Sequence, residues 1–450
     1  MSLPLSHAGG SVDGISAALD LRFASSLSLT STSGLTPSFS RASTGTFFNS
    51  SGVLTTAAIN APRFDYVYDG SAWVSKGLLV EEQRTNTSTY SEQFDNAAWT
   101  KAGGSISANQ IAAPDGATTA DKFTENSGSS VHYCLGSGGS IANNTICTAS
   151  CFVKKGDRRY VYLTLNDGTA TRLRYTVIFD LDTGTGVNEF SIGSPTDTGY
   201  FIQNFSNGWY KISVKIKTGS SQAYACEMAI GMSDSASPST RDFTNPSYTG
   251  NGSSNFYLWG TQVEAGAFPT SYIPTTTAAV TRSADVCQIT GGDFTSFWNA
   301  TEGTFATEGD NLINIGVGSS REFAIVGAEK TSTSNESVTI WKRSAEGLSA
   351  SVTVVGGAIP VSIYGSSAWA DGATGRVAFG FKLNDYASSF NGSAVSTDTS
   401  GVMPSGLEEL AIGYLRNSGG SIGTFFNGHI SRLRYYAIRL PNRLLIAKST

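Results

Sequence analysis

The chain has 450 residues, a length that suggests about two to four domains. Its net charge is −5, and its 14% charged residues and 50 glycines are typical of an all-β protein with many tight turns. No Lys/Arg cluster exceeds a pair, which argues against a nucleic-acid partner. The start MSLPLSHAGG lacks the pattern of a secretion signal and no run of about 18 apolar residues occurs, so we expect neither Sec export nor a membrane span.

Residues 1–89 are predicted to form a small β-rich region. Short strand-like runs flank a DG turn at Asp69 and Gly70, and the apolar content is too low for a convincing independent core. Such a segment gains stability by docking on something else. We therefore predict an attachment or oligomerisation region.

Residues 90–285 show the clearest alternation of apolar and polar residues. In KISVKIK, three apolar side chains face one way and four polar ones face the other: Ile212, Val214 and Ile216 against Lys211, Ser213, Lys215 and Lys217. This pattern predicts a half-buried antiparallel strand. The denser runs RRYVYLTL and LRYTVIFDL, with the turn signals NDG and DTGTG, indicate further strands of a β-sandwich or jelly roll.

The end of this region combines a strand with an extended linker. In NFYLWGTQVEA, Phe256 and Leu258 are expected on one face and Tyr257 and Trp259 on the other. The Pro- and Thr-rich tract from Gly266 to Thr281 favours extended backbone and indicates a domain boundary.

Residues 286–450 are predicted to form a second sandwich. RVAFGFKL repeats the period of two, and NG turns recur in FNGS and FNGH. Only the terminal RLPNRLLIAKST has helical spacing. The predicted fold class is therefore all-β, with tandem antiparallel β-sandwiches after a small β-rich region.

Candidate catalytic residues are sparse. The three histidines, His7, His132 and His429, are far apart in sequence, and no nucleophile, zinc or phosphate-loop motif occurs. We therefore interpret His132 and His429 as polar edge residues of strands. No catalytic residue is assigned. A glycosidase needs only two carboxylates, and it is the enzyme class that the sequence excludes least well. The acidic residues occur as the adjacent pairs Glu81/Glu82 and Glu408/Glu409. Because neighbouring residues of a strand point to opposite faces, neither pair can be an acid and nucleophile dyad. We interpret them as solvated charges or as ion-pair partners of Arg84 and Arg432.

Metal sites are equally weak in the sequence. Five cysteines are scattered and odd in number, and we predict buried thiols rather than disulfides or a metal pair at Cys147 and Cys151. Asp180 and Asp182 in DLDTGTG could provide oxygen ligands for a structural calcium, although a hairpin turn is the favoured interpretation.

Several stretches resemble one group of proteins. FSRASTGTFFNSSGVLTTAAINAPRFDY, GLLVEEQRTN, YSEQFDNAAWTK, NGWYKISV and FYLWGTQVEAGAFPTSYIPTTTAAVTRSADV resemble tailed-bacteriophage and prophage virion proteins of the tail-fibre or head-spike type. The resemblance spans nearly the whole chain. It implies a carbohydrate-binding jelly roll in residues 90–285 and a concanavalin A-like lectin domain in residues 286–450, ending in FNGHISRLRYYAIRLPNRLL.

Sugar binding is the function that these patterns favour. A pyranose ring stacks on Trp or Tyr while its hydroxyls need fixed polar side chains. Trp209 and Trp259 lie in the family-like motifs and are assigned to packing. Aromatic residues outside those motifs, with polar neighbours, are the predicted carbohydrate-binding residues: Tyr133, Tyr160, Tyr162, Trp341, Trp369, Asn384, Asp385 and Tyr386.

The sequence therefore predicts a non-enzymatic virion adsorption protein, located on the particle surface. Its expected partners are bacterial surface polysaccharide, other virion proteins and further copies of itself, with a trimer implied by the resemblance. No cofactor is expected beyond the calcium at Asp180 and Asp182. Two alternatives stay open: a purely structural capsid decoration or tail connector, and a glycan-depolymerising hydrolase.

Overall fold

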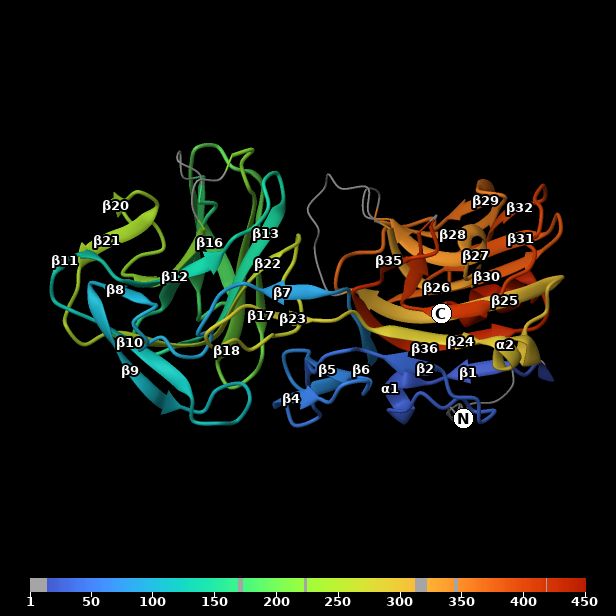
Figure 1. The fold of residues 1–450 in the computed structure, drawn as a ribbon, viewed down its shortest axis with the longest axis horizontal. Coiled ribbons are helices and arrows are strands. Elements are labelled where there is room, and N and C mark those ends of the chain that lie inside the picture. The colour runs from blue at the N-terminus through green and yellow to red at the C-terminus, as the bar shows by residue number, and fades with distance from the viewer. Residues whose placement is uncertain (1–13, 169–172, 222–224, 312–321, 344–346, 418) are drawn as a thin grey trace, which may run out of the picture.

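The computed structural model describes residues 14–168, 173–221, 225–311, 322–343, 347–417 and 419–450. It confirms the predicted all-β class, with two antiparallel β-sandwiches that lie end to end along the longest axis of the molecule (Figure 1). The helices in this part of the chain are short: α1 (Phe23–Ser26), α2 (Gly291–Phe297) and α3 (Asn442–Lys448). None of these helices has the length and apolar content needed to cross a bilayer.

The middle sandwich consists of two six-stranded sheets. The first has the order β17 (Thr196–Asn204), β18 (Trp209–Lys217), β13 (Ile146–Lys155), β22 (Asn255–Ala265), β10 (Ala120–Glu125) and β9 (Gly104–Ile111). The second has the order β16 (Thr185–Ile192), β15 (Arg174–Asp180), β14 (Tyr160–Asn166), β19 (Cys226–Ser233), β12 (Tyr133–Gly139) and β8 (Thr100–Ala102). Three short strands form a small additional sheet: β11 (Ser129–Val131), β21 (Asn245–Thr249) and β20 (Arg241–Asp242). The core between the two large sheets uses residues from Phe94 to Val263, one continuous stretch of chain.

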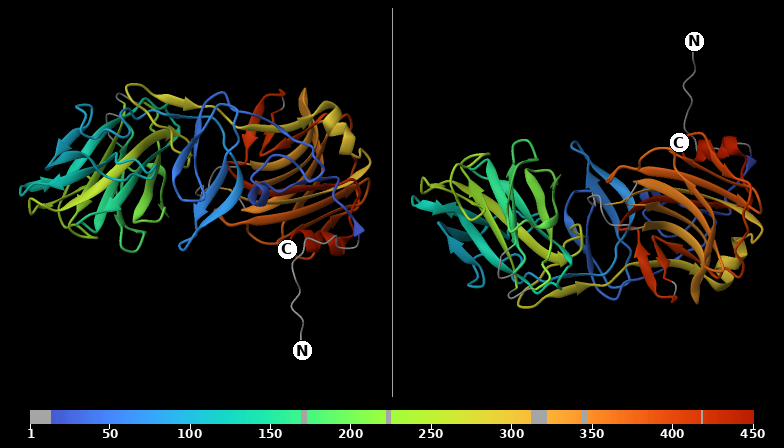
Figure 2. Two further views of the ribbon diagram at one scale, coloured as in Figure 1. Left: turned by 90° about the horizontal axis from the view of Figure 1, so that it is seen from below. Right: turned by 90° about the horizontal axis from the view of Figure 1, so that it is seen from above.

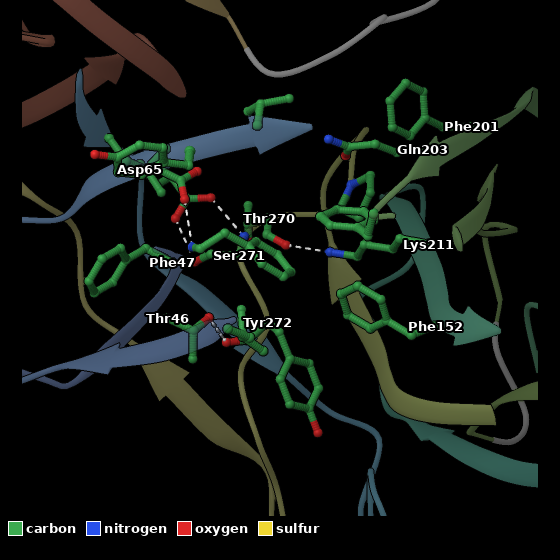
Figure 3. Close-up of a pocket in the computed structure, with 18 residues that line it drawn as sticks. Thr46, Phe47, Asp65, Phe152, Phe201, Gln203, Lys211, Thr270, Ser271 and Tyr272 are labelled. Atoms are coloured by element: carbon green, nitrogen blue, oxygen red, sulfur yellow. Dashed lines mark hydrogen bonds between the residues drawn. The ribbon is translucent and has the colours of Figure 1, made fainter. Parts of the chain in front are cut away.

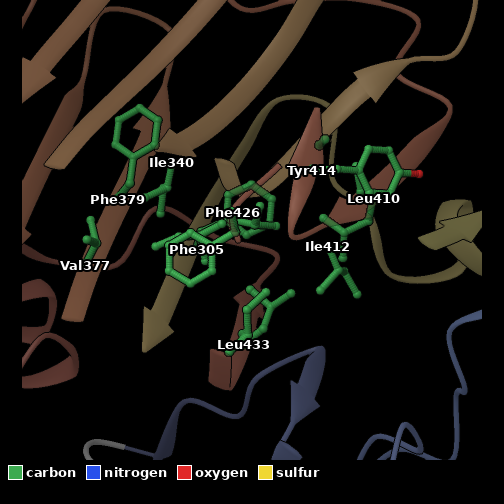
Figure 4. Close-up of a cluster of buried hydrophobic side chains, with 14 of the residues drawn as sticks. Phe305, Ile340, Val377, Phe379, Leu410, Ile412, Tyr414, Phe426 and Leu433 are labelled. Carbon is green, nitrogen blue, oxygen red and sulfur yellow. The ribbon is translucent and has the colours of Figure 1, made fainter. Parts of the chain in front are cut away.

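The C-terminal sandwich pairs an eight-stranded and a seven-stranded sheet. The eight-stranded sheet contains β32 (Ser396–Asp398), β31 (Tyr386–Phe390), β30 (Gly375–Lys382), β25 (Glu302–Asn311), β36 (Gly428–Tyr436), β6 (Trp73–Val80) and β5 (Phe64–Tyr68), with β1 (Leu19–Leu21) also paired to β36. The seven-stranded sheet has the order β2 (Ser38–Ser40), β24 (Val286–Thr290), β33 (Glu409–Ile412), β26 (Glu322–Lys330), β27 (Thr333–Arg343), β28 (Leu348–Val355) and β29 (Ala358–Tyr364). Aromatic and aliphatic side chains from both sheets fill the space between them, among them Phe305, Phe379, Ile412 and Leu433 (Figure 4).

Strands from residues 14–89 complete this second sandwich. In β1, Leu19 pairs with Tyr435, and in β6, Leu78 pairs with Ile430. Leu19, Leu78 and Val80 are fully buried in the C-terminal core. Residues 1–89 are predicted to be a separate region, whereas the strands of residues 14–89 share sheets and a core with residues 286–450 and also reach the middle sandwich (Figure 2).

Three two-stranded ladders complete the described strands. They are β7 (Arg84–Asn86) with β23 (Val280–Arg282), β3 (Gly45–Phe48) with β4 (Leu54–Ala57), and β34 (Tyr414–Arg416) with β35 (Ile422–Phe425). The β7–β23 ladder lies between the two sandwiches (Figure 1). It holds the segment that enters the middle sandwich against the segment that leaves it.

A buried ionic cluster, here called the junction network, holds together the chain segments that connect the two sandwiches. It consists of Arg41, Arg63, Glu81, Arg282 and Asp285, and all five side chains are at most 1% exposed. Asp285 accepts from Arg41 at 3.0 Å, from Arg63, and from the backbone N–H of Glu81 at 2.9 Å. Glu81 in turn accepts from Arg63 at 2.8 Å.

The network also reaches the linker after β22. Ser271 donates to Glu81 through its backbone N–H at 2.8 Å and through its hydroxyl at 2.7 Å. Burial alone would raise the pKa of Glu81, but Arg282 and Arg63 hold that pKa well below its ordinary range. Each buried charge faces an opposite charge, and this attraction offsets the cost of desolvation. The network links residues 41–81 to residues 271–285.

Candidate functional site

The site is built on the outer face of β17 and β18. The prediction for KISVKIK is confirmed for its apolar face, since Ile212, Val214 and Ile216 are fully buried in the middle core. The opposite face is also covered, with Lys211 only 7% and Lys215 only 9% exposed. That face is therefore not a solvated surface but the floor of an enclosed site.

The pairing of β17 with β18 sets the side chains of this floor in rows. Gly199 pairs with Lys215, Phe201 with Ser213, and Gln203 with Lys211. Since alternate residues of a strand point to one face, Phe201 and Gln203 lie on the same side as the two lysines. The sheet thus offers a ring, an amide and two ammonium groups side by side.

Three adjoining hollows follow β17, and together we call them the junction groove. Their volumes are about 500, 70 and 370 Å³, and we call them the wide, narrow and far hollows. Phe201 contributes to all three, and Pro269 of the linker borders the wide and narrow ones. The far hollow is closed by β5, β6 and the C-terminal sandwich.

The narrow hollow is the most enclosed part of the groove. There the Lys211 ammonium donates to the carbonyl of Thr270 at 2.7 Å and lies 5.7 Å from the centre of the Phe152 ring (Figure 3). Burial lowers the pKa of Lys211. Its hydrogen bond to the linker backbone gives this lysine a partner inside the chain.

The wide hollow has a mixed lining. Lys215, Ser213 and Thr148 are on its floor side, and the ring of Tyr200, 40% exposed, borders it. Burial lowers the pKa of Lys215 as well. Glu189 accepts a hydrogen bond from the Tyr175 hydroxyl at 2.6 Å. The hollow therefore presents an ammonium, hydroxyls, a carboxylate and aromatic faces.

The far hollow lies beside a second buried ionic cluster. His429 contacts Asp310 at 2.7 Å and Asp65 at 2.8 Å, and Lys76 contacts Asp310 at 2.9 Å. Burial alone would lower the pKa of His429, but Asp310 and Asp65 raise it to about 9. The imidazole is therefore protonated at neutral pH, in contrast to the predicted polar edge residue.

The dimensions of the groove suit a polar ligand of sugar size. Ligand sites of about 300 to 1,000 Å³ are typical for small molecules, and the wide and far hollows fall in that range. The Phe201 ring can stack on the apolar face of a pyranose, and the amide of Gln203, on the same face of β17, can bond its hydroxyls. The arrangement is chemically suited to binding.

The structure places the sequence-predicted residues elsewhere and does not bring them together. Tyr133, Tyr160 and Trp341 are half-buried, and Asn384 and Asp385 are exposed. They lie in two different sandwiches, and no described hollow of the groove includes them. Sugar binding by these five residues stays a prediction.

Three predicted sugar-binding aromatics are in the core. Tyr162, Trp369 and Tyr386 are at most 2% exposed, so they offer no ring face to a ligand in this structure. Each ring lies against a glycine where a Cβ atom would collide with it, at Gly231, Gly375 and Gly401 respectively. The missing side chain of the glycine is what allows each ring to be buried.

Packing assignments are confirmed for the motif tryptophans and the thiols. Trp209 and Trp259 are 4% and 1% exposed, and all five cysteines are free and buried. The acidic pairs differ from expectation, because Glu81 belongs to the junction network and Glu409 is buried in an ion pair with Arg416 at 2.5 Å. His132 is buried too, and its ring contacts the carbonyl oxygens of Gly103 and Tyr248.

The proposed calcium ligands are already paired with cations of the chain. Asp180 accepts from Arg159 at 2.8 and 2.6 Å, and Asp182 accepts from Lys155 at 2.6 Å. The pair stands at a hairpin between β15 and β16. Within the described ranges, no group of three or more His, Cys, Asp or Glu side chains could hold a metal ion. Calcium at Asp180 and Asp182 stays a prediction.

Sequence reasoning missed the residues that line the groove. Tyr200, Phe201 and Gln203 lie on an edge strand without a motif, and Lys215 was interpreted only as part of a polar strand face. The sequence feature that could have indicated the groove was the pair Lys211 and Lys215 on one strand face, together with Pro269 in the linker. That signal becomes specific only when the linker is seen to fold over the strand.

Comparisons with known proteins add little to this geometry. The chain matches no known protein-family model and no curated protein. A carbohydrate-binding module, CBM40, of a Ruminococcus gnavus sialidase bound to sialyllactose is 13% identical over 35% of this chain and 88% of that one, with a TM-score of 0.30. Domains LG4-5 of the mouse laminin alpha1 chain are 11% identical over 69% of this chain and 86% of that one, with a TM-score of 0.23.

A third similar structure is the Trypanosoma rangeli sialidase in complex with the inhibitor DANA. It is 12% identical over 87% of this chain and 67% of that one, with a TM-score of 0.24. These likenesses carry no argument about ligand or activity.

Proposed function

We propose that this chain is a non-enzymatic glycan-binding protein on the surface of a tailed phage or phage-like particle, as a tail fibre or head spike, where it attaches the particle to bacterial surface glycan. The observation that carries the proposal is the junction groove. It combines two hollows of sugar size, the ring of Phe201 and polar side chains without hydrogen-bond partners among the described residues.

The aromatic and amide groups of β17 are the core of the binding site. Phe201 supplies ring surface, and the side-chain amide of Gln203 makes no hydrogen bond with the described residues, so both ends of that amide are available to hydroxyls. A pyranose needs this combination of an apolar face and directional polar groups. The groove therefore supports glycan binding better than it supports a purely structural role.

The virion part of the proposal rests on the motifs that resemble phage fibre and spike proteins. Those motifs supply the junction network: Arg41 lies in FSRASTGT, Arg63 in APRFDY, and Glu81 in GLLVEEQRTN. Ser271, Arg282 and Asp285 come from the tract that closes the middle sandwich. An appendage that meets a cell surface benefits from such a rigid link between its domains.

Oligomerisation would strengthen weak single sites. When several copies of a chain engage one surface, affinity rises by factors of about 10² to 10⁴ without new contacts. A homo-oligomer, with a trimer favoured by the resemblance, fits this use.

Binding without catalysis is supported by the state of the carboxylates around the groove. Asp310 is held by His429 and Lys76, and Asp69 accepts from the backbone N–H groups of Ser71 and Ala72 at 2.8 Å each. Carboxylates in such roles are poorly placed to serve as a general acid and a nucleophile.

An array of bacterial surface glycans tests the proposal. The full chain should show saturable binding, and Phe201→Ala and Gln203→Ala should each reduce it by about tenfold or more. Phe243→Ala is the matched control, because Phe243 is 61% exposed and lies outside the groove. Absence of binding to every glycan would favour a structural spacer, and shortened glycan chains would favour a hydrolase. Immunogold microscopy of particles tests the virion location.

A further inference from the structure

The wide hollow is lined by a lysine whose ammonium has no hydrogen-bond or ion-pair partner among the described residues. Lys215 is 9% exposed, and it makes no hydrogen bond, ion pair or ring contact with any described residue. The chain shields most of this side chain from water, and burial accordingly lowers the pKa of Lys215. Such a group in a hollow of about 500 Å³ calls for an anion.

The three lysines of β18 show that this state is specific to one position. Lys211 donates to the carbonyl of Thr270 at 2.7 Å, so its charge is stabilised within the chain. Lys217 is half-buried and lies outside the groove. Lys215 alone of the three combines deep burial, a place in the hollow and the absence of a described partner.

Nearby carboxylates do not neutralise this ammonium. Asp197 acts on Lys215 through space and raises its pKa, but it forms no ion pair with it. Glu189, the carboxylate that lines the same hollow, accepts from Tyr175 at 2.6 Å. The second oxygen of Glu189 is left to accept a hydroxyl.

We infer that the wide hollow binds an anionic sugar residue of a bacterial surface glycan, with the anionic group on Lys215 and the sugar ring against Phe201. The inference rests on the proposed glycan-binding function and names the class of its ligand. Ser213 and Glu189 are placed to hydrogen-bond the hydroxyls of the same sugar. An ammonium is a point charge, so either a carboxylate or a phosphate on the sugar satisfies it.

The test uses the full chain and an array of oligosaccharides in matched pairs. Each acidic member, with uronate or sugar phosphate groups, is printed beside a counterpart from which carboxyl reduction or dephosphorylation has removed the charge. The wild type should bind at least one acidic member about tenfold or more tightly than its neutral counterpart. The uronate and phosphate pairs show which anion is recognised.

Substitutions then assign this preference to one side chain. Lys215→Gln should abolish it, Lys215→Arg should restore most of it, and Lys217→Gln on the same strand should leave it unchanged. Thermal melting of each variant verifies that the fold is intact. Equal binding of charged and neutral partners, or a charge preference that survives in Lys215→Gln, would overturn the inference while leaving glycan binding in place. No binding to any member would instead overturn the proposed function.

Discussion

The two sandwiches of this protein are assembled in different ways. The middle sandwich draws its core from one continuous stretch between Phe94 and Val263. The C-terminal sandwich draws its core from both ends of the chain, with Leu19 opposite Tyr435 and Leu78 opposite Ile430. The difference teaches that a strand can be recognised locally, while the sheet it joins depends on partners hundreds of residues away.

Deleting residues 1–80 breaks this comparison most severely. The deletion removes β1, β2, β5 and β6, together with the buried side chains Leu19, Leu21, Phe23, Leu78 and Val80. We expect the C-terminal sandwich to lose its fold while the middle sandwich stays folded, because the core between the two sheets of the middle sandwich uses none of residues 1–80. The middle sandwich loses the contacts of a separate cluster with Phe48 and Leu54. Limited proteolysis with mass spectrometry should show cleavage spread over residues 286–450 and protection of residues 100–265. Equal protection of both would contradict the shared core.

Asp285→Ala removes the central carboxylate of the junction network, which connects the two sandwiches. The substitution leaves Arg41 and Arg63 buried without their carboxylate, and we expect the free energy of unfolding to fall by about 3–5 kcal/mol. The control is Glu308→Gln, which breaks the half-exposed pair with Arg376 at 3.0 Å and should cost less than about 1 kcal/mol. Chemical denaturation measures both. A similar loss in the two variants would show that burial of the network contributes nothing special.

The His429 cluster makes the stability of the C-terminal sandwich dependent on pH. The pKa of His429 rises from 6.5 to about 9 in the folded protein, so its stabilisation is complete below pH 6.5 and is lost as pH rises through about 9. The shift corresponds to roughly 3 kcal/mol. Burial raises the pKa of Glu329 to about 8, so Glu329 titrates in an overlapping range. Thermal melting between pH 6 and 10 of wild type and His429→Gln separates the two, and an identical pH dependence would contradict the role of His429.

The smallest expected effect concerns a residue that the sequence assigned to sugar binding. Asn384 has φ = 55°, in the left-handed region, and its side-chain oxygen accepts from the N–H of Gly401 at 3.2 Å. We expect Asn384→Ala to lower the free energy of unfolding by about 1 kcal/mol and Asn384→Gly to lower it less, since glycine tolerates this backbone conformation. Chemical denaturation measures the difference. A loss of glycan binding at unchanged stability would restore the predicted role.

The sequence predicted the fold class and the inward faces of the strands well. Alternation in β18 and in β22 identifies Ile212, Val214, Phe256 and Leu258, which are all fully buried. Two-residue periodicity is a local property, and for that reason it survives without any knowledge of tertiary structure. The location of the groove is not local, because its walls come from the linker and from β5 and β6.

The burial of aromatic residues is also determined by tertiary contacts that the sequence pattern does not show. Tyr162 and Trp369 have polar neighbours in sequence, which suggested exposure, yet each packs against a glycine on another strand. Whether a ring is buried depends on the residue across the sheet. Strand pairing, which single-sequence patterns do not specify, decides that residue.

The β7–β23 ladder has a consequence for how such proteins change during evolution. Asn86 pairs with Val280, so the chain enters and leaves the middle sandwich at adjacent points. The middle sandwich is in effect a cassette inserted into a loop of the other domain, and excising it would sever no strand of the C-terminal sheets. Recombination at the β7–β23 ladder could replace the middle sandwich with another domain, while the C-terminal sandwich and its connection to the rest of an assembly stay intact.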